Sequence, residues 1–507
     1  MQGKTRNSQI AKNTLFLYLR MFFTMAVSLY TVRVVVKTLS VSDYGLYGAV
    51  GGVILTFGFI TGVLTNASQR FFSVEIGKGS RGRVGEVFGT LFLTYLIVSI
   101  IIIVLAETIG LWFLLNKMTI PVGRESAAMW VFQFSLFSFV YSLLANPFQA
   151  LIIAYERMNL YAYLSILDVA LKLGIVYLLV FFDYDKLKLY ALLMFLSYVV
   201  TNSIYIIYCK KNFDELRLLS KVDKNIFRSV FSYSSWTLFG TAASMSNTQG
   251  MNILLNVFFG PIANAAYSIA SQVFNTVSQF ASNFYTAVKP PLIKSYTSGD
   301  YNYVHKLFLF SSKVLFILLI IVVIPIMVCA ESILNIWLGS VCEYMVIFVQ
   351  LSLIFATILI ISYPITAVVQ AGGYVKAYHS LVDGFSILAL PIVYILFKLG
   401  FSAIWAYLVS IVIFSIAHGL RLYVLKKVFP VFNSYSYIKC FLIPSIGLFC
   451  ALYLVFNILS SLFFHSVILV VIYCGICSLI AFLSGFFLIL SSSERKMVFH
   501  LFRNKKF

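Results

Sequence analysis

Apolar residues fill almost the whole chain in stretches of about twenty residues or more, broken by short polar segments. Stretches of this length match bilayer-spanning helices, whereas the strands of a membrane barrel are about half as long and alternate apolar with polar residues. The pattern predicts an all-α integral membrane protein of about fourteen transmembrane helices. We expect these helices at 13–36, 44–68, 86–107, 126–153, 160–182, 187–208, 229–256, 262–288, 306–328, 345–370, 376–397, 401–424, 438–458 and 463–490.

The composition supports this prediction and excludes a soluble domain. Hydrophobic residues make up 61% of the chain and charged residues 11%, whereas roughly a quarter of the residues in a soluble domain are charged. The net charge is +20, which in a soluble protein would suggest nucleic acid as a partner. Here the basic residues lie mainly between the apolar stretches, so we attribute them to membrane topology and expect no nucleic-acid partner.

The distribution of the basic residues predicts the orientation of the chain. Alternate loops are rich in Lys and Arg, with clusters at 70–83, 209–228, 289–306 and 421–439, and the intervening loops are poor in them. Because basic loops stay in the cytoplasm, we expect both termini to be cytoplasmic.

The longest predicted cytoplasmic loop, near 209–228, divides the first twelve helices into two halves of six. The halves resemble each other: Arg70 lies 37 residues after Arg33, and Lys289 lies 37 residues after Asn252. Each half starts on the same side of the membrane, which is typical of transporters with parallel repeats around a central cleft. The predicted domains are two pseudo-symmetric six-helix bundles and a pair of extra helices with a basic tail, at 1–215, 216–430 and 431–507.

Among the basic residues within the predicted helices or at their ends, five are candidates for a substrate site: Arg20, Arg33, Arg70, Lys172 and Lys289. A charged side chain in the membrane is costly unless it faces a cavity or a partner. Together these residues would form a basic lumen for an anionic substrate, because arginine holds phosphate oxygens in a bidentate fork. Two alternatives remain: Lys172 pairs with Asp168, four residues before it, and Arg70 and Lys289 mark the cytoplasmic ends of their helices.

Amide side chains form stripes on three predicted helices at helical spacing, so each stripe lies on one face. The stripe residues are Asn66, Gln69, Gln249, Asn252, Gln272, Asn275, Gln279 and Asn283. These amides either form hydrogen bonds between helices or line a substrate cavity, where they would suit the hydroxyl groups of a sugar.

The candidates for ion coupling are Asp168, His379 and Asp383. His379 and Asp383 lie four residues apart and form either a proton relay or a static hydrogen-bonded pair. The sequence has no Walker A motif and no HExxH motif. We therefore expect a transporter without a catalytic site, metal site or cofactor, driven by an H⁺ or Na⁺ gradient, the membrane potential or the gradient of its substrate.

Three segments resemble the polysaccharide flippases, the Wzx-type O-antigen and capsule transporters of the multidrug/oligosaccharidyl-lipid/polysaccharide exporter superfamily. They are Thr31–Ala49 with its Asp43-Tyr44-Gly45-Leu46-Tyr47 stretch, Asn66–Phe72, and Gly260–Ala270. The resemblance implies a bacterial inner-membrane protein that flips an undecaprenyl-diphosphate-linked oligosaccharide to the outer leaflet by alternating access. It also implies membrane lipids and a polysaccharide polymerase as partners.

Three other interpretations of the sequence are alternatives to a polysaccharide flippase. Cation exporters of the same superfamily resemble each other in carrying a buried carboxylate in the first helix, and residues 13–36 contain none. A lipid II flippase would share both the basic cavity and the fourteen helices. An assembly partner without transport activity would not need basic residues inside several helices.

Overall fold

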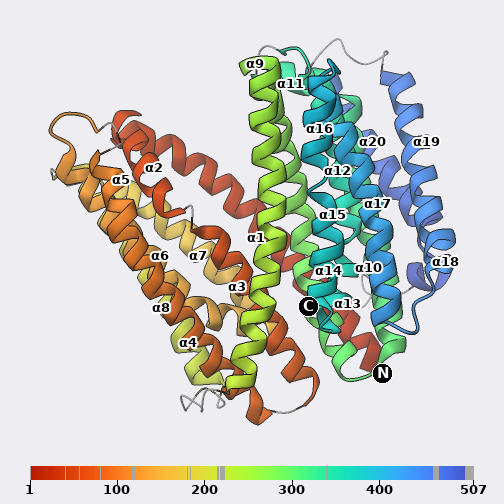
Figure 1. Ribbon diagram of the computed structural model, residues 1–507, viewed down its shortest axis with the longest axis horizontal. Coiled ribbons are helices and arrows are strands. Elements are labelled where there is room, and N and C mark those ends of the chain that lie inside the picture. The colour runs from red at the N-terminus through yellow and green to blue at the C-terminus, as the bar shows by residue number, and fades with distance from the viewer. Residues whose placement is uncertain are drawn as a thin grey trace. The chain divides into compact units, whose positions relative to one another are not determined.

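The computed structural model is built from helices, and the residues that it describes contain no strand. These residues are 2–39, 41–55, 57–79, 81–116, 118, 120–179, 181–182, 184–213, 216, 223–338, 341–460 and 467–496. The chain divides into two compact units (Figure 1). We call Lys12–Leu238 the N-terminal body, and Met1–Ala11 with Phe239–Phe507 the C-terminal body.

The N-terminal body is organised around α6, which packs against α2, α3, α4 and α8. Its elements are α1 (Gln2–Leu39), whose residues up to Ala11 belong to the C-terminal body, α2 (Val41–Leu55), α3 (Gly58–Gly77), α4 (Arg81–Leu105), η1 (Ala106–Gly110), α5 (Leu111–Asn116), α6 (Glu125–Ala154), α7 (Met158–Leu178) and α8 (Lys186–Asn212). The π-helix η1 joins α4 to α5, so that 83–116 forms one long apolar segment.

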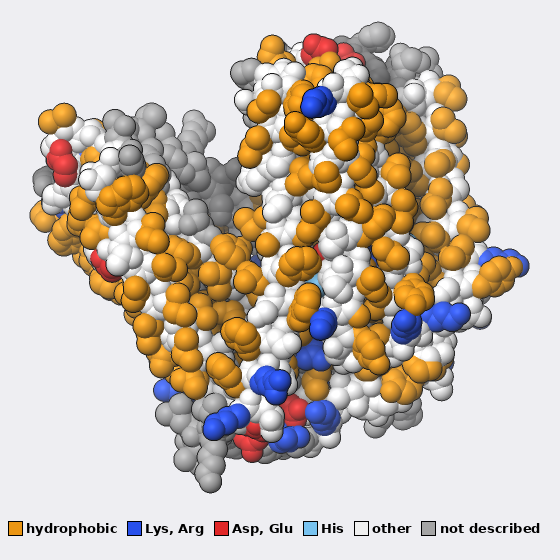
Figure 2. All heavy atoms as spheres, viewed as in Figure 1, with side chains coloured by type: hydrophobic (Ala, Val, Ile, Leu, Met, Phe, Trp, Pro, Cys, Tyr) orange, Lys and Arg blue, Asp and Glu red, His pale blue; other side chains and the backbone are white. Residues whose placement is uncertain are grey.

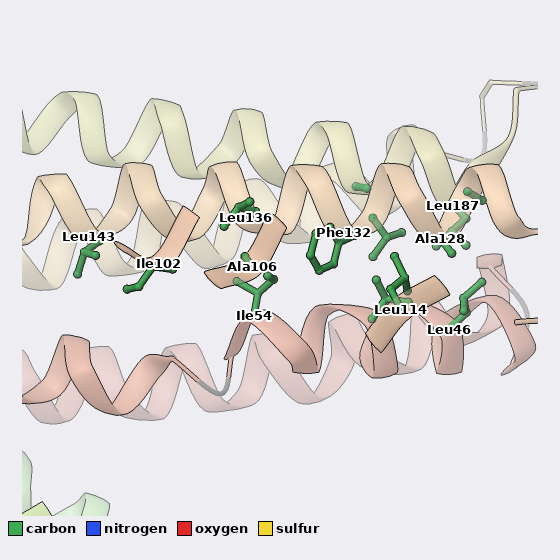
Figure 3. Close-up of a cluster of buried hydrophobic side chains, with 14 of the residues drawn as sticks. Leu46, Ile54, Ile102, Ala106, Leu114, Ala128, Phe132, Leu136, Leu143 and Leu187 are labelled. Atoms are coloured by element: carbon green, nitrogen blue, oxygen red, sulfur yellow. The ribbon is translucent and has the colours of Figure 1, made fainter. Parts of the chain in front are cut away.

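A cluster of buried apolar side chains connects these helices. Phe132 of α6 lies at its centre and is fully buried, with Ile54 of α2 and Leu114 of α5 beside it (Figure 3). Gly110 at the end of η1 makes room for the ring, since an added Cβ would lie 3.3 Å from Phe132 Cζ. Apolar packing of this kind holds α2, η1 and α5 on α6.

Arg124, the residue before α6, joins three elements through two carboxylates. Its guanidinium forms one ion pair with Asp43 of α2 and another with Asp185, the N-cap of α8, at 3.1 Å. Asp43 is 7% exposed, so its charge depends on Arg124 for compensation. The Asp43-Tyr44-Gly45 stretch is therefore fixed to the start of α6.

Replacing Arg124 with alanine is expected to destabilise the folded protein by about 2 kcal/mol, between the values for buried and exposed ion pairs. The intermediate value follows because the Arg124 side chain is 35% exposed. Thermal unfolding in detergent measures the change. Lys78→Ala is the matched control, since its pair with Glu75 is more exposed, and an equal loss in both variants would contradict the prediction.

The C-terminal body contains a long helix, α9 (Lys224–Thr297), whose residues up to 238 belong to the N-terminal body. The elements after it are α10 (Tyr301–Val328), α11 (Ala330–Leu338), α12 (Met345–Ile361), α13 (Tyr363–Ala371), α14 (Val375–Tyr378), η3 (His379–Asp383), α15 (Gly384–Ser386), α16 (Ala389–Lys398), α17 (Trp405–Val428), α18 (Ser434–Tyr437), η4 (Ile438–Leu442), α19 (Ile443–Ser460) and α20 (Val467–Leu488). Hydrophobic side chains are spread over the helices that face the viewer along their length (Figure 2).

The last helix, α20, packs against α10. Ser478 Oγ donates a hydrogen bond to the carbonyl of Ile321 at 2.9 Å, and Lys313 Nζ of α10 pairs with Glu494 at 2.7 Å. Burial raises the pKa of Glu494, but hydrogen bonds from Lys313 and from the Ser491 N–H outweigh it and hold this pKa below its usual value. The ion pair therefore fastens the segment after α20 to α10.

Ten helices are long and apolar enough to cross a membrane within the residues described, or eleven if the bent pair 46–54 and 58–77 counts as one span. The predicted apolar segments are helical, but the number fourteen stays a prediction. The predicted boundaries of the domains at 215 and 430 also stay predictions.

Several predicted helices differ from the structure in their continuity. The helix predicted at 44–68 is two helices, α2 and α3, which meet at 47°. Gly48, Gly51, Gly52 and Gly58 lower helix propensity through this region. In contrast, the helices predicted at 229–256 and 262–288 both lie in α9, which leaves the helical conformation at Gly260 (φ 78°, ψ −172°).

Candidate functional site

The structure distributes the predicted site residues over both bodies. Arg20, Asn66, Gln69, Arg70, Asp168 and Lys172 lie in the N-terminal body, and the predicted residues from Gln249 onward lie in the C-terminal body. Arg33 belongs to α1, and its side chain is outside the described ones.

Arg20 of α1 contacts two residues on successive turns of α7. Its guanidinium lies 4.9 Å from the centroid of the Tyr161 ring, and Nη1 is 3.5 Å from Ser165 Oγ. These two contacts, with a neutral hydroxyl and an aromatic ring, hold the guanidinium against α7.

Lys172 and Asp168 form the ion pair that their spacing allows. Lys172 Nζ lies 2.7 Å from Asp168 Oδ2, 3.5 Å from Tyr198 Oη and 4.5 Å from the centre of the Tyr198 ring. The opposite charges of the pair offset each other, which reduces the ability of Lys172 to attract an anion.

Arg70 lies inside α3, not at the end of a helix as the sequence predicted, because α3 continues to Gly77. Its guanidinium lies 4.9 Å from the centre of the Phe71 ring and 5.1 Å from that of Tyr233. The two rings meet edge to face at 5.9 Å. Arg70 is thus a second arginine, after Arg20, whose guanidinium lies over an aromatic ring inside a helix of this body.

The two amides predicted beside Arg70 differ in environment. Asn66 is exposed, and its Nδ2 donates to the carbonyl of Gly62 at 3.0 Å. Gln69 is half-buried. Both lie on α3 within one turn of Arg70, so the three side chains belong to one short stretch of helix.

The remaining amides lie on α9, on both sides of Gly260. Gln249 is exposed and its Oε1 lies 3.5 Å from Asn252 Nδ2. After Gly260, three amides are exposed: Gln272, Asn275 and Gln279. Asn283 is buried and donates to the carbonyl of Gln279 at 3.2 Å.

Lys289 is buried at 4% exposure within α9, whereas the sequence predicted it at the inner end of a helix. Its ammonium lies 5.9 Å from the centre of the Tyr285 ring, one turn away. The helix runs on to Thr297, because backbone hydrogen bonding continues past the end of the apolar run.

His379 and Asp383 are the first and last residues of the π-helix η3. His379 Nδ1 lies 2.5 Å from Asp383 Oδ2, and His379 is 8% exposed. The backbone of Gly240 on α9 packs against both groups, since an added Cβ would collide with the Asp383 carboxylate and with His379 Nδ1. Two turns further along α9, Asn247 Nδ2 donates to the carbonyl of Ser386 at 3.1 Å, so α9 closes over the pair.

Arg421 is a buried charge, although the distribution of basic residues predicts it at a cytoplasmic loop. It lies inside α17 and is 3% exposed. Nε donates to Tyr378 Oη and Nη1 to Ser362 Oγ, each at 3.2 Å. Ser362 Oγ also lies 2.9 Å from Nδ1 of His418. The signal in the sequence is His418 and Arg421 at a spacing of one turn within an apolar helix.

A surface cavity of about 380 Å³ lies at the connection between α13 and α14. It is lined by Gly372, Gly373, Tyr374, Lys376, Ala377 and Ser380. Throughout the described part of the chain, no group of three or more His, Cys, Asp and Glu side chains has the arrangement of a metal site.

Comparisons with known proteins identify the fold. No protein-family model matches the chain, and no curated protein matches its sequence. Among solved structures, "MATE in the straight conformation" matches with a TM-score of 0.66 and 15% identity, over 83% of this chain and 96% of that one.

Two further structures agree. A mutant of the Vibrio cholerae MATE transporter VcmN matches with a TM-score of 0.65 and 14% identity, over 85% of this chain and 99% of that one. The outward-facing conformation of a multidrug resistance MATE family transporter of the MOP superfamily has a TM-score of 0.65 and 13% identity, over 83% and 96%. The chain therefore has the fold of the MATE transporters.

Proposed function

We propose that the protein flips an oligosaccharide linked to a polyprenyl diphosphate from the cytoplasmic to the outer leaflet of the membrane by alternating access. The observation that carries this proposal is the pair of arginines on aromatic rings, Arg20 over Tyr161 and Arg70 over Tyr233. Both lie within helices of an apolar body, where a fixed positive charge favours an anionic substrate.

The composition of α1 supports an anionic substrate over a cationic one. Gln2–Leu39 contains no Asp or Glu and carries Arg20 and Arg33. A transporter for cations needs a negative group along the path of its substrate, and this helix offers only positive ones. The exposed amides of α9 add neutral hydrogen-bonding groups that suit the sugar of such a substrate.

Export against a gradient needs a coupling ion, and we propose H⁺ or Na⁺. The candidate carriers are Asp168, which is paired with Lys172, and the His379–Asp383 pair beneath Gly240. An acid with a nearby basic partner is typical of intramembrane ion relays.

A second candidate function is the export of cationic drugs. Two observations favour it: the fold is shared with a multidrug resistance transporter, and the C-terminal body holds a carboxylate, Asp383, next to a buried histidine. A cation would replace His379 as the partner of Asp383 in this mechanism.

Deletion of the gene with complementation separates the two functions. Loss of surface polysaccharide together with accumulation of the polyprenyl-diphosphate oligosaccharide inside the cell, restored by the wild-type protein, is the expected result. Unchanged polysaccharide with increased sensitivity to cationic drugs would overturn the flippase proposal in favour of the exporter.

A further inference from the structure

We propose that Arg421 forms a binding site for a small inorganic anion inside the C-terminal body, with chloride as the simplest occupant. The proposal rests on three observations about this body alone: the burial of the guanidinium, the number of its donors that the protein uses, and the positions of the carboxylates. It does not depend on the substrate that the protein transports.

The first observation is that the guanidinium is buried with most of its donors unused. A guanidinium has five N–H donors and stays protonated. Tyr378 Oη and Ser362 Oγ accept one bond each, at 3.2 Å. Within the described part of the chain the other three N–H groups have no protein acceptor. At 3% exposure bulk water reaches little of the side chain, and an additional acceptor would satisfy these donors.

The second observation is the absence of a compensating carboxylate. The C-terminal body contains only five acidic side chains, and the structure describes each of them: Asp300, Glu331, Glu343, Asp383 and Glu494. Asp383 and Glu494 form ion pairs with other residues, Asp300 caps α10, and the other two are exposed. None forms an ion pair with Arg421, although an uncompensated buried charge is strongly destabilising.

The third observation is a polar frame that holds the guanidinium from three elements. Ser362, between α12 and α13, lies within hydrogen-bonding distance of both Arg421 and His418 of α17. Tyr378 of α14 is held in turn by Thr366 Oγ1 at 2.9 Å. Nε2 of His418 is buried and has no hydrogen-bond partner. These contacts hold the Arg421 guanidinium in one position, and they leave the His418 Nε2 atom beside it without a hydrogen bond.

These features select the size and charge of the ligand. The single positive charge of the Arg421 guanidinium, which has no carboxylate partner, is neutralised by one monovalent anion. The low exposure of Arg421 and His418 favours an ion of halide size over a lipid headgroup or a polyphosphate. The bound anion would accept the remaining N–H bonds of Arg421, which are stronger than bonds between neutral groups.

The test is thermal unfolding of the full-length protein in detergent, in chloride, bromide or gluconate at one ionic strength. We expect both halides to raise the unfolding temperature above that in gluconate by several degrees, since a ligand that binds only the folded state stabilises it. Arg421→Gln is expected to lose this dependence. Lys426→Gln, an exposed change on the same helix, is expected to keep it.

A second measurement uses only the wild-type protein, so that a folding failure of Arg421→Gln does not matter. Crystals grown in bromide are expected to show an anomalous peak next to the Arg421 guanidinium. The proposal is overturned by equal unfolding temperatures in all three salts, or by no peak at Arg421. Stabilisation by phosphate or anionic lipid, with none by halides, would also overturn it.

Discussion

Replacing Arg70 with glutamine is expected to lower the export of the lipid-linked oligosaccharide on the order of 10- to 100-fold. A hydrogen bond from a charged group is worth about 1.5–3 kcal/mol, and each 1.4 kcal/mol corresponds to about a factor of ten. Glutamine retains donors and much of the volume of arginine but removes the charge. The measurement is the rate of appearance of labelled oligosaccharide in the outer leaflet, with the amount of protein in the membrane determined in parallel.

Two variants control for effects on folding. Arg70→Lys keeps the charge over Phe71 and Tyr233 and is expected to retain a substantial part of the activity. Arg157 also lies over aromatic rings, those of Tyr208 and Phe213, but in the connection between α6 and α7. Arg157→Gln should therefore export normally. Equal losses in Arg70→Gln and Arg157→Gln would mean that arginine–aromatic contacts act on stability alone.

Replacing Gly240 with alanine is expected to separate His379 from Asp383 and to abolish the dependence of export on the ion gradient. The added methyl group occupies the space of the Asp383 carboxylate and of His379 Nδ1. Because these atoms are the ends of two side chains, the pair must move while the helices stay in place. Overpacking of this kind costs about 1–3 kcal/mol, which unfolding in detergent detects beside the transport assay.

Gly419→Ala is the matched control, because a Cβ at this helical glycine meets no atom within 4 Å. It is expected to preserve both stability and ion dependence. Full ion coupling in Gly240→Ala, together with an unfolding temperature equal to that of the wild type, would remove the His379–Asp383 pair from the candidates for ion coupling.

Hydropathy located the helices because the long apolar stretches are set by the thickness of the bilayer. It did not locate their ends or breaks. Hydropathy detects only the apolar part of a helix. Backbone hydrogen bonds continue beyond it, so that α3 extends to Gly77 and α9 to Thr297. Arg70, Lys289 and Arg421, which the rule for basic residues placed in or beside cytoplasmic loops, all lie inside helices, and the side of the membrane on which they lie stays a prediction.

Spacing within one helix predicted some contacts of the candidate site and could not predict others. The pairs Asp168–Lys172 and His379–Asp383 follow from a separation of four residues, which places side chains on one face. The contacts between Arg20 and Tyr161, and between Gly240 and His379, join residues more than a hundred positions apart. A single sequence contains no periodic signal for such long-range contacts.

The π-helices η1, η3 and η4 affect how this chain is aligned with other structures of the same fold. Each accommodates one residue more than a regular turn, and such segments often lie at functional sites. An ancestor without the extra residue would present the following helix rotated by about 100°, the angle per residue of an α-helix. A sequence alignment without a gap across His379–Asp383 would then pair residues that lie on different faces of the helix after η3. A one-residue gap within each π-segment should recover the correspondence with distant members of the fold.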